Sequence, residues 1–283
     1  MKQYTVSLDW LSEHLEGVKV VDCRFSLQDS ADGLRRYQDG HIQGAVYFDL
    51  VHDLSGTVQD HGGRHPLPEV DTFLEKVEAA GIDHETTVVA YDDEGGPFAS
   101  RFWWLLRYLG HENVYVLDGS FSEWQAVGYP VDRNIPTYAK TTMDVKVKPE
   151  RLATYTYVKQ NLSDPAVHLI DAREPARFLG KVEPIDKKKG HIPNAKNRFW
   201  QDGLNGKKRK SAKEQAERFA DLPKEDEVIV YCGSGVTACP NVLTLEELGY
   251  KRVRLYVGSW SDWISHDESE IATGEEGERT RDK

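Results

Sequence analysis

The sequence predicts an α/β protein made of two copies of one domain, each a mainly parallel sheet flanked by helices. Two observations lead to this fold class. Short runs of β-branched residues alternate with segments of helical periodicity along the chain, which is typical of parallel sheets covered by helices. The same short motifs also recur in the same order in the two halves.

The repeat is visible in four pairs of segments. They are Val20–Arg24 with Leu169–Arg173, Gly40–Ala45 with Gly190–Ala195, Val88–Tyr91 with Val228–Tyr231, and Gly119–Trp124 with Gly258–Trp263. The spacing between partners shortens only slightly along the chain, as expected for one duplicated domain with a few loop deletions. A solenoid would instead show many units of about 20 to 50 residues.

Each half contains four expected strands, because β-branched and aromatic residues cluster between turn-forming residues. In order, they are Val18–Cys23, Ala45–Phe48, Thr87–Tyr91, Val114–Leu117, Val167–Ala172, Lys196–Phe199, Glu227–Tyr231 and Arg252–Tyr256. Apolar residues at helical spacing predict six helices. They are Ser7–Leu15, Thr72–Ala80, Phe98–Leu109, Ala153–Leu162, Ala212–Ala220 and Cys239–Leu248.

The domain division follows from these repeats. We expect a first domain over residues 1–130, a linker over 131–149, a second domain over 150–266 and a polar C-terminal tail over 267–283. The linker is polar and bounded by prolines. The tail is charged and poor in apolar residues, so we expect it to be frayed.

Composition limits the classes of function. The 283 residues carry a net charge of −11, which disfavours nucleic acid and anionic membranes as partners and favours small molecules. Three cysteines are too few for a disulfide framework or a four-thiolate zinc site. Since the chain also lacks an apolar signal segment and a run of about 18 apolar residues, we expect a cytosolic protein.

One cysteine stands where chemistry is expected. Cys232 directly follows the strand that ends at Tyr231, and the next helix cannot begin much before Thr237, because Pro240 is tolerated only in a first turn. Ligands bind at this edge of a parallel sheet, where a helix N-terminus points free N–H groups at the loop. Gly233 and Gly235 allow positive φ and a nest of N–H groups. The setting favours an ionised, nucleophilic thiol.

A second interpretation stays open for Cys232, namely a small buried residue at the end of a strand. That interpretation is preferred for the other two cysteines, since Cys239 lies in the expected helix and Cys23 in a strand. In the first half Asp92 replaces Cys232 and is followed by two more acids. These acids would repel an anionic substrate, so the first domain is expected to supply only the other wall of a cleft.

The loop after Cys232 limits the ligand that it can hold. Cysteine phosphatases place an arginine six positions after the cysteine to bind phosphate bidentately. Here that position is Ala238, so a single sulfur atom fits better than phosphate.

With these motifs the chain resembles the tandem-domain rhodanese family over about Tyr4 to Trp263. The segments that carry the resemblance are the loop from Cys232 to Ala238, Gly190–Pro193, Gly258–Trp263 and the first copy without the cysteine. The resemblance implies two rhodanese-like domains with sulfurtransferase activity in the second. It further implies that Cys232 takes a sulfane sulfur from 3-mercaptopyruvate or thiosulfate and passes it, through a persulfide, to a thiol or cyanide.

The resemblance leaves the donor open. The Gly-Ser-Gly sequence after Cys232 is similar to 3-mercaptopyruvate sulfurtransferases, and Arg177 matches a substrate-anion arginine of both branches. The second arginine of mercaptopyruvate enzymes is absent, and Ile185 stands near its position. His65 matches a histidine of the active cleft, whose acidic partner is replaced here by Val51. A surface ion pair for Arg177 and a loop role for His65 remain as alternatives.

The sequence therefore predicts a sulfurtransferase that acts through Cys232 without a metal or organic cofactor. The residues expected to bind the substrate are Gly233, Ser234, Gly235, Val236, Thr237, Arg177 and His65. The expected partners are a small-molecule sulfur donor and a thiol or cyanide acceptor. The rival hypothesis is a non-catalytic protein-binding or redox-sensing module in which Cys232 only packs.

Overall fold

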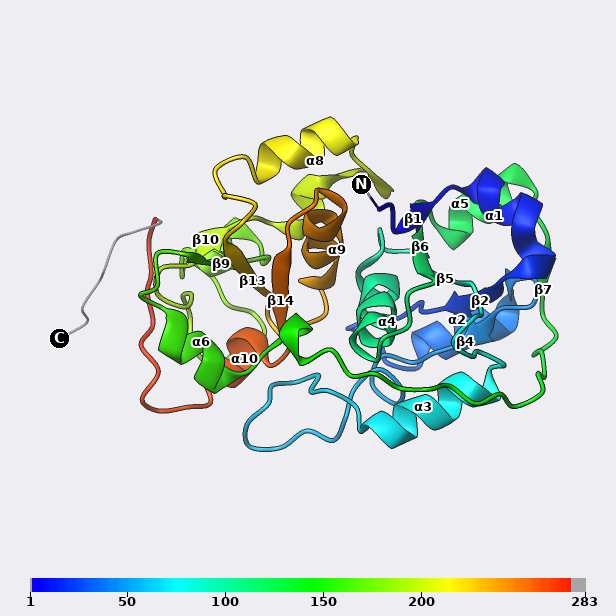
Figure 1. Ribbon diagram of the computed structural model, residues 1–283, viewed down its shortest axis with the longest axis horizontal. Helices are drawn as coiled ribbons and strands as arrows, with labels where there is room; N and C mark the ends of the chain where they lie inside the picture. Colours follow the sequence, from blue (N-terminus) through cyan, green and yellow to red (C-terminus); the bar gives the residue numbers. More distant parts are fainter. Residues whose placement is uncertain (1, 276–283) are drawn as a thin grey trace.

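The computed structural model describes residues 2–275, which form two α/β domains lying side by side (Figure 1). The first contains strands β1 Thr5–Val6, β2 Lys19–Asp22, β3 His41–Ile42, β4 Val46–Tyr47, β5 Val88–Tyr91, β6 Val114–Leu117 and β7 Val131–Asp132. Its helices are α1 Leu8–His14, α2 Asp32–Asp39, α3 Val70–Ala79, α4 Pro97–Tyr108 and α5 Phe121–Val127, with the 3-10 helix η1 Leu15–Gly17.

The second domain repeats this plan. Its strands are β8 Leu152–Ala153, β9 Val167–Asp171, β10 Lys196–Asn197, β11 Leu204–Asn205, β12 Lys208–Arg209, β13 Glu227–Tyr231 and β14 Arg252–Tyr256. Its helices are α6 Tyr155–Asn161, α7 Pro175–Phe178, α8 Ala212–Arg218, α9 Cys239–Glu247 and α10 Ser259–Trp263, with the 3-10 helices η2 Pro149–Arg151 and η3 Trp200–Gly203.

The two main sheets have the same topology. Their strand orders are β1-β6-β5-β2-β4 and β10-β9-β13-β14-β8, which coincide when the second is read from its other edge. All neighbouring strands in both sheets are parallel. The predicted fold class of two tandem α/β domains is therefore confirmed.

All eight predicted strands and all six predicted helices are present, with ends shifted by a few residues. The missed elements are mostly short, such as the two-residue edge strands β1 and β8 and the four-residue helix α7. The prediction placed Ala153 in a helix, whereas it ends β8. Helix α6 begins two residues later, because the side chain of Thr154 accepts the N–H of Tyr157 and caps the helix.

The two domains share a continuous apolar core. Every residue of α4 from Pro97 to Arg107 is buried, which is typical of a helix covered on all sides. On one side α4 packs on β5 and β6, and on another it packs on α9 of the second domain. One cluster of buried apolar residues accordingly runs from the first sheet to the second. This packing fixes α4 of the first domain against α9 of the second.

Two of the repeated motifs form the same buried ion pair in each domain. Arg24 Nη2 lies 2.6 Å from Asp22 Oδ2 and donates to the carbonyl oxygen of Gly40 at 2.7 Å. The corresponding distances in the second domain are both 2.6 Å, and the residues are Arg173, Asp171 and Gly190. The recurrence of these motifs is thus explained by a structural role: each pair ties the end of a central strand to a distant loop.

The C-terminal segment differs from the expectation of a frayed tail. Ala272 pairs with His191 through two backbone hydrogen bonds of 2.8 and 3.0 Å, and the indole N–H of Trp263 donates to the carbonyl of Glu270. Residues 270–274 therefore pack on the second domain, and residues 276–283 lie outside the described part. No helix between residues 2 and 275 has the length and apolar character needed to cross a membrane.

Candidate active site

Cys232 lies directly after β13, which pairs with a parallel strand on each side. Helix α9 begins at Cys239 with Pro240 in its first turn, so the loop between them faces a helix N-terminus. Cys232 is only 1% exposed. Its sulfur is not simply packed among apolar atoms, because the N–H of Gly235 donates to it at 3.2 Å.

The loop is anchored by the Gly-Ser-Trp motif. The backbone N–H of Cys232 donates to Ser259 Oγ at 3.1 Å, and the N–H of Trp260 donates to the carbonyl of Cys232 at 3.0 Å. Ser259 has a φ of 55°, a conformation that few residues other than glycine adopt. The strained residue thus stands where its hydroxyl holds Cys232 in place.

The two glycines of the loop serve different purposes. Gly235 has a φ of +77°, and a Cβ there would lie 2.2 Å from the carbonyl oxygen of Val257. Gly233 was expected to have positive φ as well, and it does not. A Cβ on Gly233 would instead lie 3.0 Å from Arg64 Nη2 and 3.6 Å from Arg177 Nη2. Gly233 therefore makes room for two guanidinium groups beside Cys232.

In the first domain, the loop that corresponds to the Cys232 loop surrounds the side chain of Asp92. The buried carboxylate of Asp92 accepts four backbone hydrogen bonds of 2.9 to 3.1 Å, and the donors are Glu94, Gly96, Phe98 and Ala99. Asp92 thus fills a nest of N–H groups with its own negative charge. The loop of this fold is suited to an anion, and in the second domain the residue at that position is Cys232.

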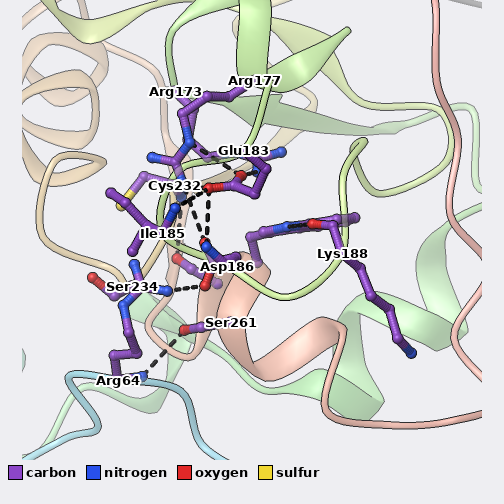
Figure 2. A network of polar contacts seen from close by, with 12 residues as sticks. Arg64, Arg173, Arg177, Glu183, Ile185, Asp186, Lys188, Cys232, Ser234 and Ser261 are labelled. Carbon is purple, nitrogen blue, oxygen red and sulfur yellow. Dashed lines mark hydrogen bonds and ion pairs between the residues drawn. The ribbon is translucent and has the colours of Figure 1, made fainter. Parts of the chain in front are cut away.

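Arg177 belongs to a network of charged groups next to the Cys232 loop (Figure 2). Its guanidinium donates to Glu183 through Nε at 3.1 Å and Nη2 at 2.7 Å, and to Asp186 Oδ2 at 3.0 Å. The side chain of Arg177 is 13% exposed and that of Glu183 only 1%. The alternative of an ordinary surface ion pair therefore does not describe it.

Arg64 is the main site residue that the sequence interpretation missed. It comes from the first-domain loop between β4 and α3, whose end also contacts α10 through a hydrogen bond from the Arg64 N–H to Ser261 Oγ. Its guanidinium donates to Asp186 Oδ1. In the sequence, the indication that Arg64 lies at the site was its position directly before His65.

His65 lies against the loop of the second domain. Its Nδ1 is hydrogen-bonded to Ser234 Oγ at 2.8 Å. Burial, together with the charges of Arg101 and Arg64, lowers the pKa of His65 to about 4, so the ring is neutral at pH 7. The hydroxyl of Ser234, which was expected to bind the substrate, is thus hydrogen-bonded to a first-domain histidine.

The remaining predicted positions are Val236 and Thr237 of the same loop. Val236 is buried in the core and Thr237 is half-buried at the start of the turn before α9. Ile185 and Val51, which stand near family charged positions, are 53% and 41% exposed. Asp53, close to Val51, is paired with Lys76. Val51 therefore offers no acidic partner to His65, whose ring is hydrogen-bonded to Ser234 instead.

Arg101 is a second residue that the sequence interpretation missed. Although it is fully buried, it forms no ion pair within residues 2–275. Its guanidinium donates to four carbonyl oxygens, at distances of 3.2 to 3.4 Å, in Gly235, Leu54, His65 and Pro66. Burial lowers the pKa of Arg101. Arg101 is thus a buried cation, without a carboxylate partner in the described part of the chain, that contacts the Cys232 loop at Gly235.

The other two cysteines are buried thiols. Burial raises the pKa of Cys239 to about 12, and its thiol donates to the carbonyl of Gly235 at 3.3 Å. Burial also holds the pKa of Cys23 well above its usual value. Both therefore stay protonated at neutral pH and unsuited to nucleophilic attack.

One group between residues 2 and 275 has the side-chain types and proximity for a metal ion, namely His61, Asp262 and His266. The imidazole rings of the two histidines are stacked, 4.0 Å apart and 7° from parallel. Asp262 already accepts the N–H of Gly62 and the hydroxyl of Tyr256, both at 2.7 Å. Parallel rings do not direct their nitrogen lone pairs at one point, so this group fits a metal poorly.

Two similar parallel-sheet domains with one cysteine loop define a rhodanese-type protein. The sequence profile of the rhodanese-like domain matches residues 7–127 and 154–266, so the chain belongs to the rhodanese family.

Two relatives that match nearly the whole chain are named after different sulfur donors, 3-mercaptopyruvate and thiosulfate. The chain is 41% identical over 262 residues to a probable 3-mercaptopyruvate sulfurtransferase of Pseudomonas aeruginosa, covering 90% of this chain and 92% of the relative. It is 35% identical to SseB, a putative thiosulfate sulfurtransferase of Mycobacterium tuberculosis, covering 91% of each chain. The crystal structure of SseA, a 3-mercaptopyruvate sulfotransferase from Escherichia coli, superimposes with a TM-score of 0.81 at 30% identity, covering 92% of this chain and all of that one.

Proposed function

We propose that the chain is a sulfurtransferase in which Cys232 carries the transferred sulfur as a persulfide. The observation that carries the proposal is the N–H of Gly235, which donates to Cys232 Sγ at 3.2 Å at the carboxyl end of an inner strand. An N–H directed at sulfur stabilises a thiolate or an anionic persulfide more than a neutral thiol. Membership in the rhodanese family and the names of the relatives support the same activity.

The reaction has two displacement steps. The Cys232 thiolate attacks the sulfur of 3-mercaptopyruvate, the carbon–sulfur bond breaks, and the electron pair leaves as the enolate of pyruvate. The thiol proton of the donor ends on the enolate carbon, so the products are pyruvate and an anionic Cys232 persulfide. A nucleophile such as cyanide then attacks the outer sulfur, forms thiocyanate and regenerates the thiolate.

Thiosulfate is the alternative donor in the proposal. Attack on its outer sulfur releases sulfite and gives the same persulfide. The acceptor is a thiol or cyanide, and neither a metal nor an organic cofactor takes part. The net charge of −11 disfavours a nucleic acid partner, and the three free cysteines fit a reducing, cytosolic setting.

The proposed site extends around the sulfur from both domains. Arg177 would orient the anionic end of the donor, and neutral His65 would hold Ser234, two residues after Cys232. The proposed substrate-binding residues are Gly233, Ser234, Gly235, Val236, Thr237, Arg177 and His65.

The test is the release of pyruvate from 3-mercaptopyruvate and of sulfite from thiosulfate, measured with cyanide present. Cys232→Ser should abolish both, whereas Cys239→Ser should retain at least half of the wild-type rate. The rival hypothesis is a non-catalytic protein-binding or redox-sensing module, in which the buried Cys232 only packs. Turnover of neither donor by the wild-type protein would support that rival.

A further inference from the structure

Two arginines from different domains converge beside Cys232. A Cβ on Gly233 would lie 3.0 Å from Arg64 Nη2 and 3.6 Å from Arg177 Nη2, so both guanidinium groups lie close to the residue that follows the cysteine. Both also hold one carboxylate. Asp186 accepts from Arg64 through Oδ1 and from Arg177 through Oδ2, the latter at 3.0 Å (Figure 2). One carboxylate between two guanidinium groups is the arrangement that recognises a carboxylate ligand.

We propose that Arg64 and Arg177 form a carboxylate-binding site that spans the two domains, and that Asp186 fills it until the carboxylate of the sulfur donor takes its place. The inference rests on the proposed function, because the site adjoins the cysteine assigned to sulfur transfer. Arg64 also provides the second arginine, which the sequence lacks near Ile185. This second arginine belongs to the first domain.

The two arginines keep other supports when Asp186 leaves. Arg177 remains held by Glu183, which accepts from its Nε at 3.1 Å and its Nη2 at 2.7 Å. The backbone at Arg64 remains tied to the second domain by its hydrogen bond to Ser261 Oγ. Exchange therefore leaves the Arg177 guanidinium held by Glu183, while the Arg64 guanidinium passes from Asp186 to the ligand carboxylate.

Holding the Asp186 carboxylate in this site costs desolvation free energy. Its side chain is 4% exposed, and burial raises its pKa above the usual value although Arg64 and Arg177 act in the opposite direction. Desolvation of a carboxylate offsets much of what an ion pair gains. A ligand carboxylate that makes the same two contacts can thus replace Asp186, whose own carboxylate returns to water.

Charge balance selects the class of donor. The network contains three cations and three anions, namely Arg64, Arg173, Arg177, Asp171, Glu183 and Asp186. A carboxylate with one negative charge replaces Asp186 without changing this balance. A dianion such as thiosulfate would leave one negative charge uncompensated in a network whose members, apart from the partly exposed Arg64, are buried or nearly buried, and such a charge is costly. The site therefore favours a donor with a single carboxylate, such as 3-mercaptopyruvate.

Pyruvate tests the site without sulfur chemistry, because it carries the carboxylate and the keto group of 3-mercaptopyruvate but no sulfur. We would titrate it calorimetrically into the full-length wild-type protein, Asp186→Asn and Arg64→Gln. Asp186→Asn should bind pyruvate about tenfold more tightly and Arg64→Gln about tenfold more weakly than the wild type. Asp186→Ser removes the carboxylate in a second way and should behave as Asp186→Asn does.

Two further titrations serve as controls. Arg35→Gln, which removes a cation from an exposed pair with Asp29, should match the wild type. Sulfate, as a dianion probe, should bind the wild type more weakly than pyruvate. Sulfate binding as tight as that of pyruvate would overturn the selection of a monocarboxylate.

Unchanged or weaker pyruvate binding in both Asp186 variants would overturn the exchange, since Asp186 would then orient the arginines instead of filling their site. Wild-type affinity in Arg64→Gln would remove Arg64 from the site. Turnover of 3-mercaptopyruvate by the wild type separates this inference from the proposed function. Normal turnover with unaltered pyruvate affinities refutes only the exchange, whereas no turnover refutes the sulfurtransferase proposal whatever the titrations give.

Discussion

The guanidinium of Arg101, in the first domain, donates a hydrogen bond of 3.2 Å to the carbonyl oxygen of Gly235, in the second. The N–H of the same Gly235 donates to Cys232 Sγ. Gly235 thus connects the buried Arg101 of the first domain to the sulfur of Cys232. The first domain lacks a cysteine in its loop, yet it takes part in holding the loop that has one.

Arg101→Lys should impair both stability and sulfur transfer. Lysine keeps the charge but cannot reach all four carbonyl oxygens. The carbonyls of Gly235 and Pro66 keep the Cys239 thiol and the Gly56 N–H as donors, whereas those of Leu54 and His65 lose the donor that Arg101 supplies, and each such loss costs about 1 to 3 kcal/mol. We expect the free energy of unfolding in urea to fall by about 2 kcal/mol or more and kcat to fall with KM nearly unchanged.

Arg107→Lys is the matched control, because Arg107 lies on the same helix α4 and pairs with Glu112 instead. It should leave kcat at the wild-type value. A normal kcat in Arg101→Lys would show that the Gly235 contact does not position the sulfur.

The two loop glycines should respond differently to alanine. Gly235→Ala adds a methyl group 2.2 Å from a backbone oxygen at a φ of +77°, so we expect a loss of about 3 kcal/mol or more in unfolding free energy. Gly233→Ala meets only the ends of two arginine side chains, so the fold should persist while KM for the donor rises several-fold. Thermal unfolding and donor kinetics measure both effects, and equal destabilisation by the two changes would refute the distinction.

The fold and the position of Cys232 between a strand and a helix N-terminus could be predicted from sequence because both depend on local patterns. Strand and helix periodicity, the repeated motifs and Pro240 after Cys232 each act within a short stretch of chain. Arg64, Arg101 and Asp186 could not be found in this way, because their roles depend on how the two domains pack. The prediction for Gly233 was wrong for the same reason. Its lack of a side chain makes room for Arg64 and Arg177, and its backbone does not need positive φ.

His65 should make stability depend on pH. Its pKa of about 4 in the folded protein is lower than the value of about 6.5 expected for the unfolded chain. Between these values the unfolded chain binds a proton that the folded protein does not, so stability falls as pH falls from about 6.5 towards 4. For His65→Gln, the loss of unfolding free energy between pH 7 and 4.5 should be about 2 kcal/mol smaller than for the wild type. Parallel urea titrations with identical losses would contradict a neutral, buried His65.

The most direct test of the account is the mass of the intact protein after incubation with 3-mercaptopyruvate and removal of excess donor. We predict one added sulfur, about 32 Da, that peptide mapping places on Cys232 and that cyanide removes. Cys232→Ser should show no such mass and Cys239→Ser should show all of it. A cyanide-labile sulfur found on Cys239, or no added mass with either 3-mercaptopyruvate or thiosulfate, would contradict the assignment of Cys232 as the sulfur carrier.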